Sequence, residues 1–435
     1  SNQFSVTRQV PYSESNPREE IDMVIFVNGL PLITLELKNQ WTGQNARLHG
    51  QNQYRKQRDP KEPLLNFGRC LVHMTADTDE VFMTTKLNST DTFFLPFNQG
   101  YENGKGNPPN PFGHKTAYLW EEVFKPKSIA NIIQHFVRLD GKSKDPINKR
   151  TLFFPRYHQM RVVRKIMAHV SDNGTGFRYL IQHSAGSGKS NSITWAAYQL
   201  IEAYPENEQA AGKKAIDQPI FDSVIVVTDR RLLDRQIREN IRSFSEVKNI
   251  VAPAYSSRGL KDSLEQGKKI IITTIQKFPF IVEGISDLSD KRFAVIIDEA
   301  HSSQSGTTAD NLNRAIGQES TEAEAEDVQD KIAQVMQSRK MQTNASYLAF
   351  TATPKNSTLE KFGMPQEDGS FEPFDLYAMK QAIEEGFILD VLNNYTTFKS
   401  YYRLTKSAEE NPIFDTKKAQ KKLKAFVEKD QQTID

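Results

Sequence analysis

The sequence of 435 residues contains a single cysteine, Cys70, which excludes an intrachain disulfide framework and is typical of a protein of the reducing cytoplasm. No apolar run approaches the roughly 18 residues of a membrane-spanning helix, and no signal-peptide pattern opens the chain. An excess of either charge is also missing: 56 basic and 54 acidic side chains leave a net charge of +2, so contact with a polyanion depends on local patches. The 8 histidines and the cysteine lack the spacing of zinc ligands, which argues against a zinc protein.

The hydrophobic pattern predicts an α/β protein of two to three domains. Residues 1–140 carry short β-rich runs and then a helical stretch at 120–139, and residues 141–150 are polar and turn-prone, as in a linker. Residues 151–355 alternate helices with apolar strands, as expected of a parallel sheet covered on both faces. Residues 356–435 are predicted to be a connector and the truncated start of another domain, and the absence of an initial Met indicates a fragment. The predicted strands of the parallel sheet are 177–182, 223–229, 269–275, 293–299 and 346–352.

The stretch HSAGSGKS at 183–190 predicts a phosphate-binding loop, because it lies between a predicted strand and a helix with one apolar stripe. Its glycines allow backbone N–H groups to converge on phosphate oxygens, and the helix N-terminus adds positive potential. We expect Lys189 to reach the β- and γ-phosphates of ATP and Ser190 to hold Mg²⁺. The predicted ATP-binding residues of the loop are Ser184, Ala185, Gly186, Ser187, Gly188, Lys189 and Ser190.

The stretch VIIDEAH at 295–301 predicts the acidic partner of that loop. A carboxylate at the end of a strand can hold the Mg²⁺ of such a site, which assigns this role to Asp298. Glu299 is then placed to orient or deprotonate the attacking water. An Asp-Glu pair often merely ends a strand, but after a phosphate-binding loop it indicates ATP hydrolysis.

These two motifs resemble those of superfamily 2 helicases of the DEAH-box kind, and further segments in the same order continue the resemblance over about 200 residues. By resemblance, Arg156 and Gln159 of FPRYHQ recognise adenine, and Thr351 and Thr353 of FTATP couple hydrolysis to movement. The segments 226–236 and 271–278 match those that touch the nucleic-acid backbone, with Arg230, Thr274 and Gln276 as the DNA-binding residues. The second RecA-like domain of the family, with its arginine finger, has no match here, so this chain alone is expected to bind ATP and hydrolyse it slowly.

A second charged motif lies in the N-terminal strand ITLELKNQ at 33–40, where Glu36 and Lys38 alternate with apolar residues. Residues i and i+2 of a strand share a face, so both charges point the same way. With Asp22 upstream, the pattern is that of a PD-(D/E)xK nuclease. Asp22 and Glu36 would share a divalent metal, and Lys38 would position or activate water and stabilise the transition state. The alternative is an edge-strand ion pair that opposes aggregation.

The turn between the two strands provides a geometric test of the nuclease interpretation. A two-residue loop, Asn28-Gly29, would place Asp22 on the face opposite Glu36. A three-residue loop at 27–29 would place Asp22, Glu36 and Lys38 on one face. The nuclease interpretation therefore predicts the odd loop, with Gly29 left-handed in a bulge.

The stretch VNGLPLITLELKN at 27–39 resembles the nuclease core of the restriction (motor, R) subunits of type I restriction-modification enzymes, and the stretch at 52–87 continues the resemblance. Gln53 and Tyr54 match a Gln and a Tyr that follow the nuclease core in that family. The resemblance covers nearly all of the chain and implies a nuclease domain at 1–140, a RecA-like translocase domain at 151–355 and the start of a second motor domain. It implies a type I site-specific deoxyribonuclease with DNA-dependent ATPase activity that cuts unmodified double-stranded DNA. The implied cofactors are ATP and Mg²⁺, and the implied partners are the modification (methyltransferase) and specificity subunits.

Two other functions stay open on the sequence alone. A helicase-nuclease of DNA repair or recombination also joins these modules, but there the nuclease normally follows the motor, whereas here it precedes it. The other is a DEAH-like ATP-driven remodeller with an inactive nuclease fold, against which loss of metal binding on replacing Glu36 would argue. The basic stretch 229–242 either contacts DNA or is a solvated helix face, and the charged stretch 308–343 predicts a surface helix.

Overall fold

The computed structural model describes residues 2–13, 16–142, 144–228, 251–254, 256–298 and 344–389. Residues 1–387 form one compact unit, and of the second unit, 388–435, only Ile388 and Leu389 are described. The charged stretches 229–242 and 308–343 therefore lie outside the described residues. Within the described part of the chain, no helix has the length and apolar character needed to cross a membrane.

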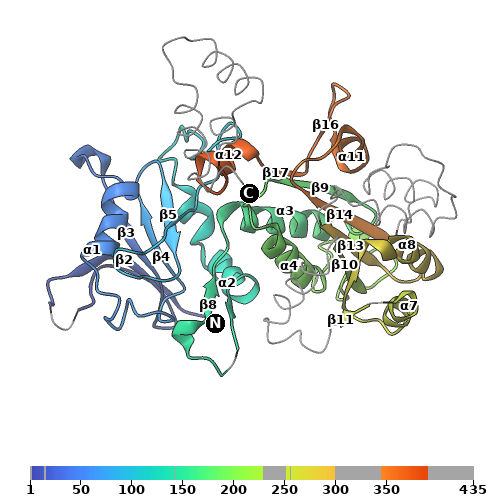
Figure 1. The fold of residues 1–435 in the computed structure, drawn as a ribbon, viewed down its shortest axis with the longest axis horizontal. Helices are drawn as coiled ribbons and strands as arrows, with labels where there is room; N and C mark the ends of the chain where they lie inside the picture. The colour runs from blue at the N-terminus through green and yellow to red at the C-terminus, as the bar shows by residue number, and fades with distance from the viewer. Residues whose placement is uncertain are drawn as a thin grey trace, which may run out of the picture. The chain divides into compact units, whose positions relative to one another are not determined.

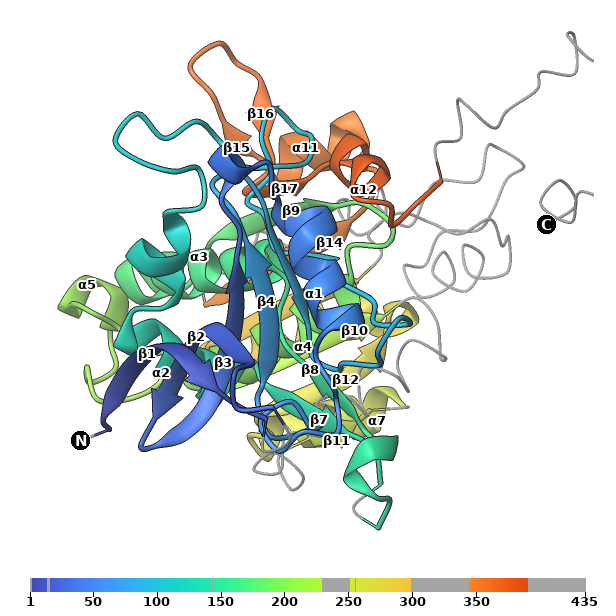
Figure 2. The same ribbon diagram turned by 90° about the vertical axis from the view of Figure 1, so that its left-hand side faces the viewer.

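The N-terminal region forms a six-stranded mixed sheet (Figures 1 and 2). The first three strands form an antiparallel meander, the third pairs in parallel with the fourth, and the remaining pairs are antiparallel. The predicted β-rich runs are confirmed as strands, and the sequence analysis did not single out the first and the last strand. In spatial order they are β1 (Phe4–Pro11), β2 (Glu20–Val27), β3 (Leu30–Leu37), β4 (Val72–Ala76), β5 (Val81–Thr84) and β6 (Leu95–Pro96).

The turn between β2 and β3 differs from the predicted one. It is a two-residue loop in which Asn28 and Gly29 both have positive φ, 53° and 77°, as a type I′ turn requires. A bulge then shifts the register: Phe26 pairs with Pro31, but Ile25 pairs with Ile33. The register continues through Met23 and Leu35 and places Asp22 opposite Glu36. The predicted three-residue loop is wrong. Asp22 and Glu36 still lie on the same face of the sheet, because the bulge leaves Leu32 without a partner on β2 and shifts the register by one residue.

The region predicted to be the motor (residues 151–355), together with the later strand at Asp375–Tyr377, forms a parallel sheet in which every pairing is parallel. The five predicted strands are all confirmed within one residue at each end, and two short strands are added at the edges. In spatial order the seven strands are β11 (Val251–Pro253), β12 (Ile270–Thr274), β10 (Ser223–Thr228), β13 (Phe293–Asp298), β14 (Ala345–Thr351), β9 (Arg178–His183) and β17 (Asp375–Tyr377).

Helices cover both faces of the parallel sheet, which explains why its strands are apolar throughout. One face packs on α3 (Tyr157–Asn173) and α4 (Lys189–Leu200), and the opposite face packs on α7 (Ser257–Glu265), α8 (Phe278–Asp287) and α11 (Asn356–Phe362). The core on the α3 and α4 side is continuous with apolar residues of the N-terminal sheet. The other α-helices among the described residues are α1 (Gln51–Lys56), α2 (Pro126–His135), α5 (Glu208–Ala211) and α12 (Met379–Glu384).

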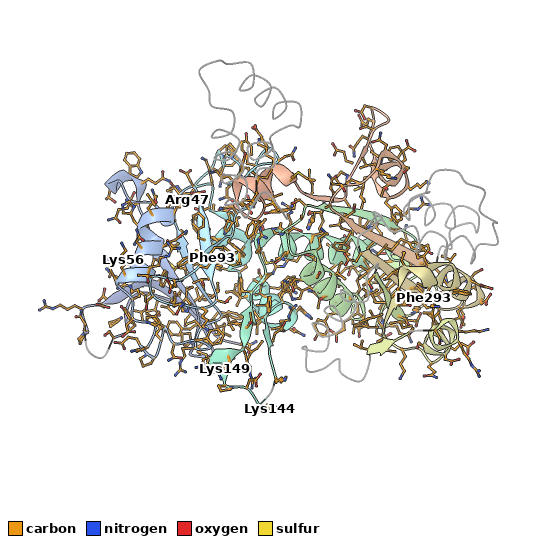
Figure 3. All side chains as sticks on the ribbon, viewed as in Figure 1. Arg47, Lys56, Phe93, Lys144, Lys149 and Phe293 are labelled. Carbon is orange, nitrogen blue, oxygen red and sulfur yellow. The ribbon has the colours of Figure 1, made fainter. Side chains whose placement is uncertain are left out.

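The helical stretch predicted at 120–139 is interrupted. A single turn at Leu119–Val123 ends before α2, which begins at Pro126, and the chain then enters strand β7 (Arg138–Asp140). Proline suits the first turn of a helix but disfavours a helical conformation in the residue before it, so one continuous helix cannot form. Strand β7 pairs with β8 (Thr151–Phe153), and exposed Lys144 and Lys149 lie in the loop between them (Figure 3).

The segment that follows Pro354 returns to the parallel sheet. After α11 it forms a small hairpin of β15 (Met364–Pro365) and β16 (Phe371–Glu372), and β17 then pairs with β9. Strand β17 therefore lies beside the strand that leads into the predicted phosphate-binding loop.

Candidate functional site

The N-terminal sheet brings Asp22, Glu36 and Lys38 together, as the motif predicted. The Nζ of Lys38 lies 3.5 Å from Oδ2 of Asp22 and 3.8 Å from Oε2 of Glu36. The Asp22 carboxylate also accepts a hydrogen bond from the backbone N–H of Leu37 at 2.7 Å. Of the three side chains, only that of Asp22 is substantially exposed, at 37%, against 8% for Lys38 and 0% for Glu36. The constellation therefore opens to solvent beside Asp22.

Glu36 is a carboxyl group inside the protein with one atom unsatisfied. Its Oε2 is buried without a hydrogen-bond partner. Burial raises the pKa of Glu36 to about 7, although the charge and hydrogen bond of Arg58 oppose the shift. The alternative of a surface ion pair on an edge strand is therefore wrong, because β3 is an inner strand of the sheet and Glu36 is fully buried.

Arg58 is a member of this site that the sequence analysis missed. Its Nε donates to Oε1 of Glu36 at 2.8 Å, and the residue is 7% exposed. One signal was present in the sequence: Gln51, Tyr54 and Arg58 have the i, i+3 and i+7 spacing of one helical face. In the structure all three residues are buried, although α1 ends at Lys56.

Of the predicted pair Gln53 and Tyr54, the tyrosine is fully buried beneath the site, whereas Gln53 is partly exposed. The hydroxyl of Tyr54 lies 2.8 Å from Oγ1 of Thr34, whose Oγ1 lies 2.7 Å from Nδ1 of His73. Gly50, just before α1, packs against the same region, since a Cβ there would fall 1.7 Å from Oγ1 of Thr75. Helix α1 is therefore seated closely on the face that carries Glu36.

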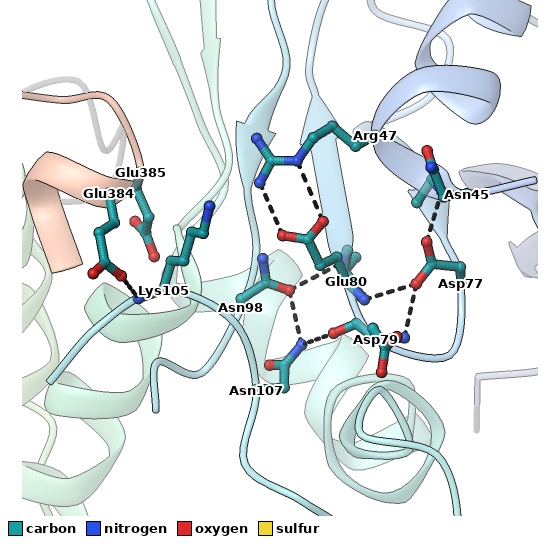
Figure 4. Close-up of polar contacts among 12 residues, drawn as sticks. Asn45, Arg47, Asp77, Asp79, Glu80, Asn98, Lys105, Asn107, Glu384 and Glu385 are labelled. Carbon is teal, nitrogen blue, oxygen red and sulfur yellow. Dashed lines mark hydrogen bonds and ion pairs between the residues drawn. The ribbon is translucent and has the colours of Figure 1, made fainter. Parts of the chain in front are cut away.

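A polar network holds the approach to α1 in place (Figure 4). Asp77 accepts hydrogen bonds from the backbone N–H groups of Ala46 at 2.7 Å and of Glu80 at 2.9 Å. Arg47 pairs with Glu80 through two hydrogen bonds of 2.8 and 3.3 Å. Asp77 and Glu80 thus hold the segment between Lys38 and α1 against the turn that joins β4 to β5.

The predicted phosphate-binding loop joins β9 to α4 at the carboxyl edge of the parallel sheet, where ligands of such sheets bind. Gly186 and Gly188 have φ of 72° and 76°, a left-handed conformation that favours glycine. A Cβ on Gly188 would also lie 2.4 Å from Nε2 of Gln159. Lys189 is the first residue of α4, so the predicted phosphate-binding residues do meet at a helix N-terminus.

Arg156 and Gln159 lie against this loop. Nε2 of Gln159 donates to the carbonyls of Ser187 at 3.0 Å and of Gly188 at 3.2 Å, and Nη1 of Arg156 donates to that of Gly186 at 3.1 Å. Arg156 also forms a buried ion pair of 3.0 Å with Glu385, a residue that the sequence analysis did not identify. The two side chains support the loop backbone from the side of α3.

The other predicted motor residues that the structure describes lie at or just beyond strand ends along the same edge. Asp298 ends β13 and is buried, Thr351 ends β14 and is buried, and Thr274 ends β12. Thr353 is exposed just beyond β14. Gln276 lies in a single helical turn at Ile275–Lys277, while Glu299 and Arg230 are outside the described residues.

Strand β17 is held to this site by a buried charge network. Asp375 receives two hydrogen bonds of 3.0 Å from Arg161 and lies 2.8 Å from Nε2 of His183. Burial raises the pKa of Asp375, but the hydrogen bond from His183 and the charge of Arg161 outweigh it and hold the pKa below its usual range. Burial lowers the pKa of His183, so the ring is neutral at pH 7 and its Nε2–H donates to Asp375.

Replacing Asp375 by alanine is expected to lower the free energy of unfolding by about 3 kcal/mol, because Arg161 and His183 lose their partner in a largely buried place. Urea unfolding of the chain, followed by tryptophan emission, measures the change, because Trp195 is fully buried and becomes exposed on unfolding. Glu372→Ala is the control, since this exposed residue of β16 is three positions away in the sequence. Equal unfolding midpoints for Asp375→Ala and Glu372→Ala would contradict the prediction.

Two family models match the chain. The model described as SWI2/SNF2 ATPase matches residues 158–425, and the one described as type I restriction enzyme R protein N terminus matches residues 1–92. The first covers the phosphate-binding loop and the strand-end motifs, and the second covers Asp22, Glu36 and Lys38. The resemblance predicted from the motifs is thereby confirmed.

The chain is also similar to curated proteins over most of its length. The type I restriction enzyme HindI endonuclease subunit of Haemophilus influenzae is 26% identical over 406 residues, which are 90% of this chain and 35% of that protein. The type I restriction enzyme SauCOLORF180P endonuclease subunit of Staphylococcus aureus is 24% identical over 408 residues, 92% of this chain and 37% of that protein. The chain thus spans about a third of the length of these relatives. Among solved structures, the ATP-dependent Type ISP restriction-modification enzyme LlaBIII bound to DNA is 14% identical, with 64% of this chain and 18% of that chain covered at a TM-score of 0.31.

Proposed function

The chain belongs to the SWI2/SNF2 ATPase family, and its first 92 residues match the N terminus of type I restriction enzyme R proteins. We propose that it is the DNA-cleaving and DNA-translocating part of a type I restriction enzyme. It would use ATP to move along double-stranded DNA and cut DNA that lacks the protective modification. The observation that carries the proposal is the meeting of Asp22, Glu36 and Lys38 on one sheet face. These residues lie in the N-terminal sheet, whereas the predicted phosphate-binding loop belongs to the parallel sheet, so the proposed ATP site does not account for them.

The carboxylates fit a divalent cation. The Oε2 of Glu36 is buried without a hydrogen-bond partner, and carboxylate oxygens are the ligands that Mg²⁺ prefers. In the described part of the chain no group of three or more His, Cys, Asp or Glu side chains could hold a metal, so Asp22 and Glu36 would need water or phosphate oxygens to complete the shell. When bound, such an ion lowers the pKa of its water and stabilises charge on the phosphate.

The protein groups around that position have separate tasks. The ammonium of Lys38 lies close to both carboxylates and is placed to stabilise negative charge that develops on the phosphate during cleavage. Glu36, whose pKa burial raises to about 7, would hold the cation through its Oε2, which has no hydrogen-bond partner. Gln53 and Tyr54 would contribute from α1, and because Tyr54 is fully buried its contribution is support of the sheet face rather than contact with DNA.

In the motor site, we assign phosphate binding to the loop 184–190 and Mg²⁺ binding to Ser190 and Asp298, with Glu299 acting on the attacking water. Arg156 and Gln159 would recognise adenine, which their position beside the loop supports. The remaining proposed roles are DNA contact for Arg230, Thr274 and Gln276, and coupling of hydrolysis to movement for Thr351 and Thr353. The modification and specificity subunits are the proposed protein partners.

The test is cleavage of circular double-stranded DNA by the full-length subunit assembled with its modification and specificity subunits, with and without ATP. We expect cutting of unmodified DNA only when ATP and Mg²⁺ are both present, and no cutting of modified DNA. Cutting that is independent of ATP would show a nuclease uncoupled from the motor. ATP hydrolysis without any cutting would favour a remodeller with an inactive nuclease fold.

A further inference from the structure

Arg58 makes contacts with two neighbouring strands, and with the residue that follows a third, at the proposed nuclease site. Its Nε donates to Oε1 of Glu36 on β3 at 2.8 Å, and its Nη2 donates to the carbonyl of Glu20 on β2 at 2.6 Å. Its Nη1 lies 3.4 Å from the hydroxyl of Tyr12, the residue that follows β1, and the guanidinium sits over the Tyr12 ring at 5.3 Å. A single side chain thus ties together the strands that carry the two carboxylates.

The two oxygens of Glu36 have different surroundings as a result. Oε1 is bound by Arg58, while Oε2 has no hydrogen-bond partner and lies 3.8 Å from Nζ of Lys38. A carboxylate bound through one oxygen cannot rotate freely, so the other oxygen stays directed toward Lys38 and the neighbouring Asp22. Ligating carboxylates are usually held in this way by an outer hydrogen bond.

We propose that Arg58 is the positioning residue of the nuclease site, holding Glu36 so that its Oε2 is presented to a divalent cation beside Asp22. The inference rests on the proposed nuclease function and adds a residue to it. A stabilising role explains the arrangement less well, because the desolvation cost of a buried ion pair commonly cancels its attraction. An arginine fits this position better than a lysine, because its planar guanidinium donates in three directions to Glu36, Glu20 and Tyr12, which a single ammonium nitrogen cannot do.

Binding of Mn²⁺ to the intact chain, measured by electron paramagnetic resonance without DNA or nucleotide, tests the proposal. Arg58→Met is expected to weaken Mn²⁺ binding by about 10- to 100-fold, the effect typical of losing an outer partner of a metal ligand. Arg58→Lys keeps the charge and is expected to recover part of the affinity. Arg55→Met is the matched control, because Arg55 donates to the carbonyl of Thr92 at 3.0 Å and lies over Phe94, away from Glu36.

The outcomes separate the roles. The proposal is overturned if a folded Arg58→Met chain binds Mn²⁺ as tightly as Arg55→Met does. If Arg58→Met does not fold, unchanged Mn²⁺ affinity of the Arg58→Lys chain overturns it. In the assembled enzyme, excess Mg²⁺ should restore the cleavage rate of the Arg58 variants, since only the ligand position is affected. Wild-type Mn²⁺ binding that survives Glu36→Gln would instead show that the proposed nuclease site itself is wrong.

Discussion

Replacing Lys38 by alanine is expected to lower the rate of DNA cleavage by at least about 10²- to 10³-fold, the usual effect of removing one preorganised group that stabilises transition-state charge. The Lys38 ammonium lies 3.5 Å from Asp22 and 3.8 Å from Glu36, and its side chain is only 8% exposed. Water therefore cannot replace it fully, and the other cation of the site, Arg58, is bound to Oε1 of Glu36. ATP hydrolysis should be unchanged, since the phosphate-binding loop belongs to the other sheet.

The measurement is the rate of double-strand cutting by the assembled enzyme, with ATP hydrolysis followed in the same reaction. Lys56→Ala is the control, because Lys56 is an exposed lysine at the end of α1 (Figure 3). Circular dichroism and unfolding curves establish that the Lys38→Ala chain is folded. A Lys38→Ala enzyme that cuts at the rate of Lys56→Ala would show that the three charges are only a structural cluster.

Replacing Lys189 by alanine is expected to lower ATP hydrolysis by at least about 10²- to 10³-fold, because the side chain is proposed to bind the β- and γ-phosphates as charge develops on them. Lys189 starts α4 directly after Gly188, the second of two left-handed glycines, at a helix N-terminus where we propose that phosphate binds. If cleavage depends on translocation, cutting should be lost to the same extent even though the nuclease residues are intact. Mn²⁺ binding measured without nucleotide should stay at the wild-type level.

Steady-state ATP hydrolysis and cutting by the assembled enzyme test this expectation. Lys213→Ala is the matched control, because Lys213 is exposed and lies in the motor region just after α5. Unchanged hydrolysis in Lys189→Ala would place the nucleotide elsewhere, and lost hydrolysis with normal cutting would show that the nuclease needs no motor. Together with Lys38→Ala, the two variants separate the two activities: one should stop cutting alone, and the other should stop both.

The sequence predicted the two modules because their signals are local. The strands of the parallel sheet are continuous apolar runs, and the phosphate-binding loop is eight consecutive residues between a strand and a helix. Glu36 and Lys38 are two positions apart, so the period of a strand is enough to place them on one face. The same reasoning misplaced the turn, because loop length alone does not reveal a bulge; Asn28-Gly29 forms the turn that this dipeptide favours, and the bulge at Leu32 restores the face of Asp22.

The amino-acid sequence by itself therefore determined most of the elements and which residue types are available for the proposed hydrolysis of ATP and of DNA. Only the tertiary structure decided the partners of those residues: Arg58 for Glu36, 22 positions away, and Asp375 for His183, 192 positions away. It also decided that β17, from the segment predicted to begin another domain, joins the parallel sheet beside β9. The physical reason is that helix and strand periodicity come from backbone geometry within a few residues, whereas the pairing of a buried charge depends on which distant segment packs against it.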